Sequence, residues 1–217
     1  FYQRGIRYVT LAHSESNHIA DSSYDLRRRW QGLSPFGKQV VAEMNRLGMM
    51  IDISHVSDQA FYQVIELSQT PVIASHSSLR AFVPGCERNM DDAMVKALAK
   101  NGGVIQINFG SSFVVSKANQ WGLQFKAALA AAPKGTDEKT FREAYLKQHP
   151  YPFANVETVL DHIDYVRKLV GVDYVGIGSD YDGVGDSLPV GLKDVASYPN
   201  LIAGLLERGY SEADIEK

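Results

Sequence analysis

The sequence contains a single cysteine, Cys86, and so has no internal disulfide framework. It has no apolar run near the roughly 20 residues of a membrane-spanning helix, and no signal peptide is visible. No basic cluster is present, because 22 basic and 25 acidic residues are interspersed and give a formal charge of -3. Nucleic acid is therefore not an expected partner, and a small molecule fits better. Since the chain opens on Phe1, we expect it to lack the protein's true beginning.

Apolar material, by contrast, is plentiful. Hydrophobic residues form 45% of the chain, enough for a sizeable core. Five short segments are apolar and rich in β-branched residues, as strands buried on both faces tend to be. These predicted strands cover residues 6–11, 49–53, 71–74, 104–108 and 174–178.

Helical patterns with start and stop signals lie between these segments. In SPFGKQVVAEMNRLG, Ser34 can serve as the N-cap, Pro35 occupies the first helical position and Gly48 ends the helix. Ser57 and Asn155 can cap two further helices. The stretch MDDAMVKALAKNGG supplies acidic residues for the first turn of another.

Strands and helices alternate along the chain, which predicts an α/β fold with a parallel sheet covered by helices. An open doubly wound sheet and part of a (β/α)8 TIM barrel both fit this pattern. Residues 110–152 interrupt it with an alanine-rich helical piece and a polar, proline-punctuated stretch, so we interpret them as an insertion at the active-site rim. Without repeats or a low-complexity linker, residues 1–217 are expected to form a single domain.

Polar side chains occur where the predicted strands end. His13, His55 and His76 follow the first three strands, Asn108 ends the fourth, and Asp180 follows the fifth. Active sites of parallel α/β proteins gather where strands run into the loops that follow them, so these side chains are expected at one end of the sheet. Three histidines and a carboxylate there favour a metal site, because imidazole is the commonest metal ligand.

Asp180 lies in GIGSDYDG, where Gly176 and Gly178 alternate with apolar residues. Glycine leaves space on one face of a strand, so we interpret this face as hollow and ending in the Asp180 carboxylate. A carboxylate there can take a proton from metal-bound water and pass it to a leaving group. Asp182 is interpreted as a turn residue before Gly183.

Other polar residues are open to two interpretations. His13 could bind metal or hydrogen-bond a substrate. Arg80 and Arg88 flank the loop after the third strand, and either could bind a substrate carboxylate or be a solvated charge. Cys86, in the same loop, has no base beside it for nucleophilic catalysis. Three histidines are expected at the rim or in structural roles: His18, His149 and His162.

Five long strings are distinctive: GLSPFGKQVVAEMNRLGMMIDISHVS, PVIASHSS, RNMDD, GIGSDYDGV and GLKDVASYPNLIAGLLERGYSEADI. In this order, over nearly the whole chain, they resemble the membrane dipeptidase family, the M19 metallopeptidases. The resemblance implies a (β/α)8 barrel of the amidohydrolase type that hydrolyses dipeptides with metal-activated water. It also implies two zinc ions per complete active site, bridged by a glutamate and a hydroxide.

The resemblance assigns a role to each candidate residue. His55 and His76 would be zinc ligands, both on the second metal. His13 would contact substrate and stabilise the tetrahedral intermediate, and Arg88 would hold the substrate carboxylate. Asp180 would carry the proton. The expected partner is therefore a small dipeptide, and a homodimer is kept open.

The family's other metal ligands are absent from this sequence. A His-x-Asp pair on the family's first strand holds the first metal, and its third strand supplies the bridging glutamate. We therefore expect the chain to be the C-terminal portion of a longer enzyme, covering about the fourth to the eighth barrel strand, and to be inactive when isolated. Two alternatives remain: a hydrolase of another amide or a lactam, and an inactive fragment or pseudoenzyme acting as a binding module. Frequent export of family members favours an exported or periplasmic bacterial location over the cytoplasm.

Overall fold

The computed structural model describes residues 1–217 and contains one sheet of five strands in the order β1-β2-β3-β4-β5. All neighbouring strands are parallel, with Tyr8 opposite Met50 near one edge and Ile107 opposite Ile177 near the other. The predicted parallel α/β fold is confirmed. The strands are β1 (Tyr8–Thr10), β2 (Met50–Asp52), β3 (Ile73–Ser77), β4 (Val104–Ile107) and β5 (Val175–Ile177).

The helices alternate with the strands up to β4 and again around β5. Short 3-10 turns cover Tyr2–Arg4, Val172–Tyr174, Gly185–Ser187 and Val195–Ser197. No helix combines the length and the apolar character needed to span a bilayer. The α-helices are α1 (Pro35–Leu47), α2 (Asp58–Leu67), α3 (Asp92–Asn101), α4 (Ser111–Val114), α5 (Ser116–Ala130), α6 (Glu138–Gln148), α7 (Val156–Val170), α8 (Tyr198–Glu207) and α9 (Glu212–Ile215).

Side-chain caps define where the main helices begin. The Ser34 hydroxyl accepts a hydrogen bond from the Gly37 backbone N–H at 2.8 Å, and Asn155 accepts one from Thr158 at 3.0 Å. Gly48 closes α1 in the left-handed conformation with φ 72°. These caps confirm the helix boundaries expected from the sequence and leave the chain free to enter the next strand.

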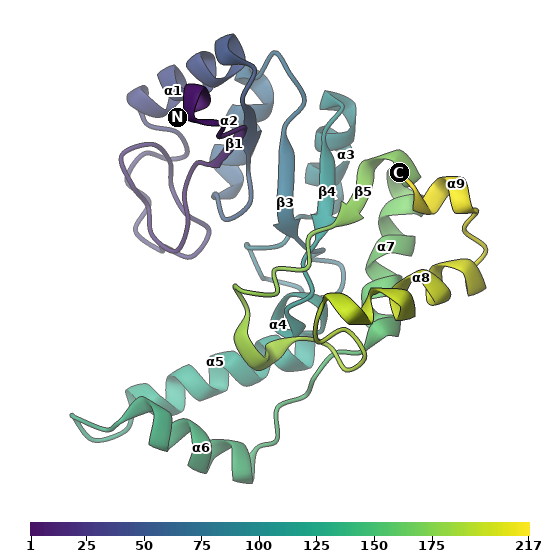
Figure 1. Cartoon of the computed structure of the whole chain (residues 1–217). Coiled ribbons are helices and arrows are strands. Elements are labelled where there is room, and N and C mark those ends of the chain that lie inside the picture. The colour runs from purple at the N-terminus through teal and green to yellow at the C-terminus, as the bar shows by residue number, and fades with distance from the viewer.

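Helices α1, α2, α3 and α7 pack side by side in chain order, and α8 packs on α7 (Figure 1). Crossovers between parallel strands are right-handed, so a sequential strand order places the connecting helices on one face of the sheet. A doubly wound sheet would carry helices on both faces, and the arrangement is therefore that of a barrel segment. Four strand residues are fully buried in the core: Ile51, Ala74, Ile105 and Ile107.

The opposite face, on the inside of the barrel curve, is open. Tyr8 and Met50 on it are 49% and 42% exposed. A cavity of about 410 Å³ runs along this face and includes Ile73 and Gln106 in its lining. Five strands cannot enclose a barrel interior by themselves, which accounts for the exposure of these apolar side chains.

Helices α4, α5 and α6 occupy the segment between β4 and α7. We call α5 and α6, residues 116–148, the arm, because this helical hairpin projects from the rest of the molecule beyond the carboxyl end of the sheet (Figure 1). Trp121 stacks on Phe125 with ring centroids 5.4 Å apart, and Tyr145 of α6 packs edge-on against both rings. The arm therefore has an aromatic cluster of its own.

Candidate metal and substrate site

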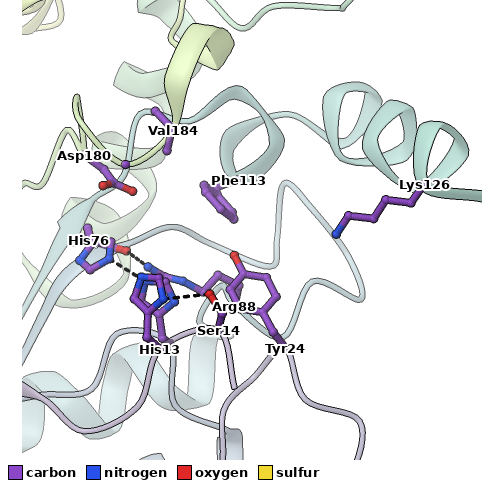
Figure 2. Close-up of a pocket in the computed structure, with 11 residues that line it drawn as sticks. His13, Ser14, Tyr24, His76, Arg88, Phe113, Lys126, Asp180 and Val184 are labelled. Atoms are coloured by element: carbon purple, nitrogen blue, oxygen red, sulfur yellow. Dashed lines mark hydrogen bonds between the residues drawn. The ribbon is translucent and has the colours of Figure 1, made fainter. Parts of the chain in front are cut away.

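The loops at the carboxyl ends of the strands surround a cavity of about 460 Å³ (Figure 2). The structure brings together in its lining all five residues to which the family resemblance gave a role: His13, His55, His76, Arg88 and Asp180. The cavity is further lined by Ser14, Tyr24, Phe113, Lys126, Gly183 and Val184.

His55 and His76 face one another, with 2.8 Å between their Nε2 atoms. The prediction that His76 follows the third strand is wrong, because β3 continues through His76 to Ser77 after a register shift. His55 lies beyond β2 in the left-handed conformation, with φ 70°. Residues other than glycine rarely adopt positive φ, and such backbone strain concentrates at functional sites.

The surroundings of this pair favour the neutral form of both imidazoles. Burial, followed by the Arg88 guanidinium and the neighbouring imidazoles, lowers the pKa of His55 to about 2. Burial, followed by Arg88, also lowers the pKa of His76. A neutral imidazole carries the lone pair that a metal ion requires, so the electrostatics of the cavity suit metal ligation.

A metal ion fits this histidine pair. Zinc binds imidazole nitrogen at about 2.0–2.1 Å, so two nitrogens on one tetrahedral ion lie about 3.3 Å apart. The observed 2.8 Å between the Nε2 atoms needs only a small opening to reach that separation. Residues 1–217 contain no group of three or more His, Cys, Asp or Glu side chains placed to hold a metal, so the pair is a partial ligand set.

His13, at the end of β1, is exposed and stacks on His55 with ring centroids 4.1 Å apart. Its Nδ1 lies 2.9 Å from the Ser14 hydroxyl oxygen. The Nε2 of His13 makes no hydrogen bond within the protein and can meet a ligand in the cavity. The geometry thus allows either of the two roles considered for His13.

Asp180, after β5, shares with His55 a left-handed backbone, here with φ 59°. Asn108 donates a hydrogen bond from Nδ2 to Asp180 Oδ2 at 2.8 Å. A Cβ atom at Gly183 would lie 2.0 Å from Asp180 Oδ1, so glycine at that position leaves room for the carboxylate. One carboxylate oxygen is therefore tethered, while the other lies against the turn that follows β5.

The face before Asp180 is hollow, because a cavity of about 410 Å³ includes Gly178 and Asp180 in its lining. The space does not come from the missing side chains of the glycines. A Cβ atom at Gly178 would lie 2.2 Å from the Ser75 carbonyl oxygen, and one at Gly176 would lie 3.3 Å from Cγ of Gln106. The neighbouring strands occupy the space that the missing side chains leave. Asp182 is exposed in the turn after β5 and does not line the cavity.

Arg88 is buried at the side of the cavity and is 5% exposed. It donates from Nη1 to Ser77 Oγ at 2.8 Å and from Nη2 to the His76 carbonyl oxygen at 2.6 Å. Its Nε has no hydrogen-bond partner, and no carboxylate of the chain forms an ion pair with it. Burial lowers the pKa of Arg88. A buried guanidinium that is not paired with a carboxylate of the chain is suited to an incoming carboxylate.

Arg80 differs from Arg88 in having its partners within the chain. It forms ion pairs with Asp58 and Asp91 and donates from Nε to the Asn89 carbonyl oxygen at 2.7 Å. Its side chain therefore holds the loop after β3 in place and does not line the cavity. Of the two arginines that flank this loop, the structure leaves Arg88 for a ligand.

The remaining candidates lie outside the cavity. His18 stacks on Phe36 with ring centroids 5.4 Å apart, and the His149 ring packs at a tilt against Tyr145 of α6. His162 is fully buried, and its Nε2 lies 3.0 Å from the Val114 carbonyl oxygen. Burial raises the pKa of the Cys86 thiol, which opposes a nucleophilic role.

Six lining residues were not predicted from the sequence, and three of them bring an aromatic ring or an ammonium group to the cavity. Tyr24 comes from the loop after β1 and lies with its ring centroid 5.8 Å from that of His55. The Phe113 ring of α4 lies 5.6 Å from the Arg88 guanidinium carbon. Lys126 of α5 extends towards the cavity (Figure 2). Phe113 and Lys126 belong to residues 110–152, which the sequence analysis placed at the active-site rim. No other feature of the sequence indicated these two residues.

A barrel segment whose strand ends gather imidazoles, a carboxylate and a buried guanidinium is typical of metal-dependent hydrolases. Comparison with known proteins narrows this class. The chain belongs to the membrane dipeptidase family, peptidase family M19, whose family model matches residues 1–217. The predicted family is confirmed. It is a family of metallopeptidases, which implies a metal cofactor.

The chain is 38% identical over 222 residues to Dipeptidase 3 of Mus musculus and 37% identical over 217 residues to Dipeptidase tcpJ of Claviceps purpurea. Both alignments cover 100% of this chain but only 37% and 43% of the relatives. The chain therefore spans about two fifths of the length of these curated proteins.

Solved structures show the same partial coverage. The probable dipeptidase PvdM from Pseudomonas aeruginosa is 34% identical, with a TM-score of 0.78 over 98% of this chain and 60% of that protein. A metallo peptidase from Rhodobacter sphaeroides, liganded with a phosphinate mimic of the dipeptide L-Ala-D-Ala, is 27% identical, with a TM-score of 0.76 over 99% of this chain and 53% of that one. The barrel segment seen here is thus part of a larger fold in its relatives.

Proposed function

We propose that this chain carries the part of a zinc-dependent dipeptidase that binds the second metal and the substrate carboxylate. The observation that carries the proposal is the buried Arg88 guanidinium, which forms no ion pair with a carboxylate of the chain and lines the same cavity as the histidine pair. A dipeptide offers a terminal carboxylate close to its amide bond. Arg88 would bind that carboxylate and so direct the amide towards the histidine pair.

Each side chain then has a chemical role. His55 and His76 would hold zinc through their Nε2 atoms. When bound, zinc polarises the scissile carbonyl and lowers the pKa of water. Asp180 takes a proton from the attacking water and delivers it to the departing amine nitrogen, with its carboxylate oriented by Asn108. His13 donates a hydrogen bond to the oxyanion as the carbonyl becomes tetrahedral.

The complete activity belongs to a longer protein in this proposal. Two zinc ions, a first-metal ligand pair and a bridging glutamate would require residues beyond the segment described here. We therefore expect the 217-residue chain alone to be inactive and the full-length protein to hydrolyse dipeptides. Loss of zinc on dialysis against a chelator, with loss and recovery of turnover, tests the metal part.

The carboxylate part is tested by comparing a dipeptide with its C-terminal amide as substrates of the full-length protein. We expect the wild type to prefer the dipeptide and Arg88→Met to lose that preference, since a charge-assisted hydrogen bond contributes about 1.5–3 kcal/mol, or roughly 10-fold to 150-fold. Lys126→Met removes another cation of the cavity and serves as the matched control. Equal rates on both substrates in the wild type would contradict the proposal, as would loss of the preference in Lys126→Met alone.

A further inference from the structure

His76 is joined through Ser75 to a buried carboxylate. Ser75 Oγ lies 2.7 Å from His76 Nδ1 and 2.6 Å from Asp52 Oδ2. Asp52, at the end of β2, is fully buried and forms no ion pair. Its Oδ2 also accepts a hydrogen bond from Thr10 Oγ1 at 2.6 Å, and its Oδ1 accepts from the backbone N–H groups of Ser54 and Ser75, both at 3.0 Å.

The direction of these hydrogen bonds determines where the imidazole proton lies. Ser75 donates a hydrogen bond from Oγ to Asp52 Oδ2, so the single proton of its hydroxyl points to Asp52. Ser75 Oγ must then accept from His76, which places the imidazole proton on Nδ1. The lone pair is left on Nε2, the atom that faces His55 Nε2 at 2.8 Å.

We infer that Asp52 and Ser75 are positioning residues that fix His76 in the tautomer and orientation required to bind metal through Nε2. The inference rests on the proposed function, because it takes His76 to be a metal ligand. Metal-binding histidines commonly donate their other ring N–H directly to a carboxylate or carbonyl, and such partners tune metal affinity. Here a serine hydroxyl connects the imidazole on β3 to a carboxylate on β2.

The two imidazoles of the pair differ in this respect. His55 Nδ1 is buried and has no hydrogen-bond partner, whereas His76 Nδ1 is held by Ser75. Within residues 1–217, therefore, only His76 is oriented by hydrogen bonds to its second ring nitrogen. Loss of the Ser75 hydroxyl should act on metal binding through His76 alone.

If Asp52 had a purely structural role, the Ser75 and Thr10 variants would affect zinc binding alike. Asp52 also links β1 to β2, because Thr10 donates to the same Oδ2 atom at the same 2.6 Å as Ser75. Thr10 makes no hydrogen bond to His76. Removing either hydroxyl weakens the contacts of Asp52 equally, but only removal of the Ser75 hydroxyl releases the imidazole. Thr10→Val is therefore the matched control for Ser75→Ala, and Ser75→Thr is the conservative variant.

The test uses the full-length protein with ¹⁵N-labelled histidine. Long-range ¹H–¹⁵N correlation of the metal-free protein reports the His76 tautomer, with His76→Asn to assign its signals, and chelator competition gives the zinc dissociation constant. We expect a proton on Nδ1 in the wild type, Thr10→Val and Ser75→Thr. In Ser75→Ala we expect a mixture of tautomers and a dissociation constant about 10-fold to 100-fold higher.

Two results would overturn the inference: a proton on His76 Nε2 in the wild type, or equal weakening of zinc binding in Thr10→Val and Ser75→Ala. Thermal unfolding of each variant shows whether a loss of zinc affinity comes from loss of the fold. A wild-type protein that binds no zinc would instead overturn the proposed function. The tautomer is measured without metal, so the two failures are distinguishable.

Discussion

The strand ends and the arm both contribute side chains to the same cavity, but these side chains differ in burial and in their contacts. His55 and Arg88 are buried at the strand ends and packed among other site residues. Lys126 reaches the cavity from an exposed position on α5 and forms neither a hydrogen bond nor an ion pair. The arm is held together by its own aromatic cluster rather than by the sheet. We infer that the strand ends determine the chemistry and that the arm adjusts which substrates are accepted.

The largest effect is expected at Asp180. Asp180→Asn removes the proton acceptor but keeps the shape and the Asn108 contact, so kcat of the full-length protein should fall about 10²-fold to 10⁴-fold with zinc content unchanged. Steady-state kinetics and metal analysis measure both. Asp182→Asn, in the exposed turn two residues on, should leave kcat unaltered. Normal turnover in Asp180→Asn would show that another group carries the proton.

A smaller loss is expected from Gly183→Ala. The new Cβ would meet Asp180 Oδ1 at 2.0 Å and force the carboxylate aside. Misplacement of a reacting group by about 1 Å can lower the rate by about 100-fold. Gly122→Ala in the arm is the control, because nothing lies within 4 Å of its added Cβ. If both variants turn over like the wild type, the position of the Asp180 carboxylate does not limit the rate.

Lys126 should affect substrate choice rather than rate. An exposed ion pair contributes up to about 1 kcal/mol, so Lys126→Ala should raise KM up to about fivefold for dipeptides with an acidic side chain and leave kcat unchanged. Dipeptides with neutral side chains provide the control measurement. A drop in kcat for both substrate types would mean that the arm takes part in the chemistry, which would break the distinction between the two regions.

The smallest effect concerns the contact between α7 and α4, next to the arm. His162 on α7 contacts the Val114 carbonyl oxygen, and burial lowers its pKa from 6.5 to about 4. The folded state therefore binds fewer protons than the unfolded state between these pH values, and stability is lost as pH falls from 6.5 to about 4. In urea unfolding of the full-length protein from pH 7 to 4, His162→Gln should reduce proton uptake on unfolding by about one. An unchanged pH dependence would contradict this role.

Much of the fold could be predicted from the sequence because its signals are local. Apolar strands, the Ser34 and Asn155 caps and the Gly48 stop each depend on a few neighbouring residues. The end of β3 was misplaced because SHS carries no apolar pattern, and its pairing is fixed by the neighbouring strand β4. Local patterns thus predicted the elements but not every strand boundary.

The sequence pattern predicted the site residues that lie at or just after the carboxyl ends of the strands. His13, His55 and Asp180 occupy such positions, and parallel topology brings them together. Arg80 and Arg88 could not be separated on spacing, because the difference lies in burial and in the partners Asp58 and Asp91. Tyr24 and Lys126 come from a loop and from the arm, whose placement depends on packing between distant segments.

Only three residues other than glycine have positive φ: Gln31, His55 and Asp180. Glycine at His55 or Asp180 would remove the strain of the left-handed backbone conformation. Each such substitution should raise the free energy of unfolding by on the order of 1 kcal/mol. Directed evolution towards heat resistance alone would therefore favour loss of the very side chains that the proposed chemistry uses. A library built on this scaffold should keep codons 55 and 180 invariant and seek its stabilising changes elsewhere.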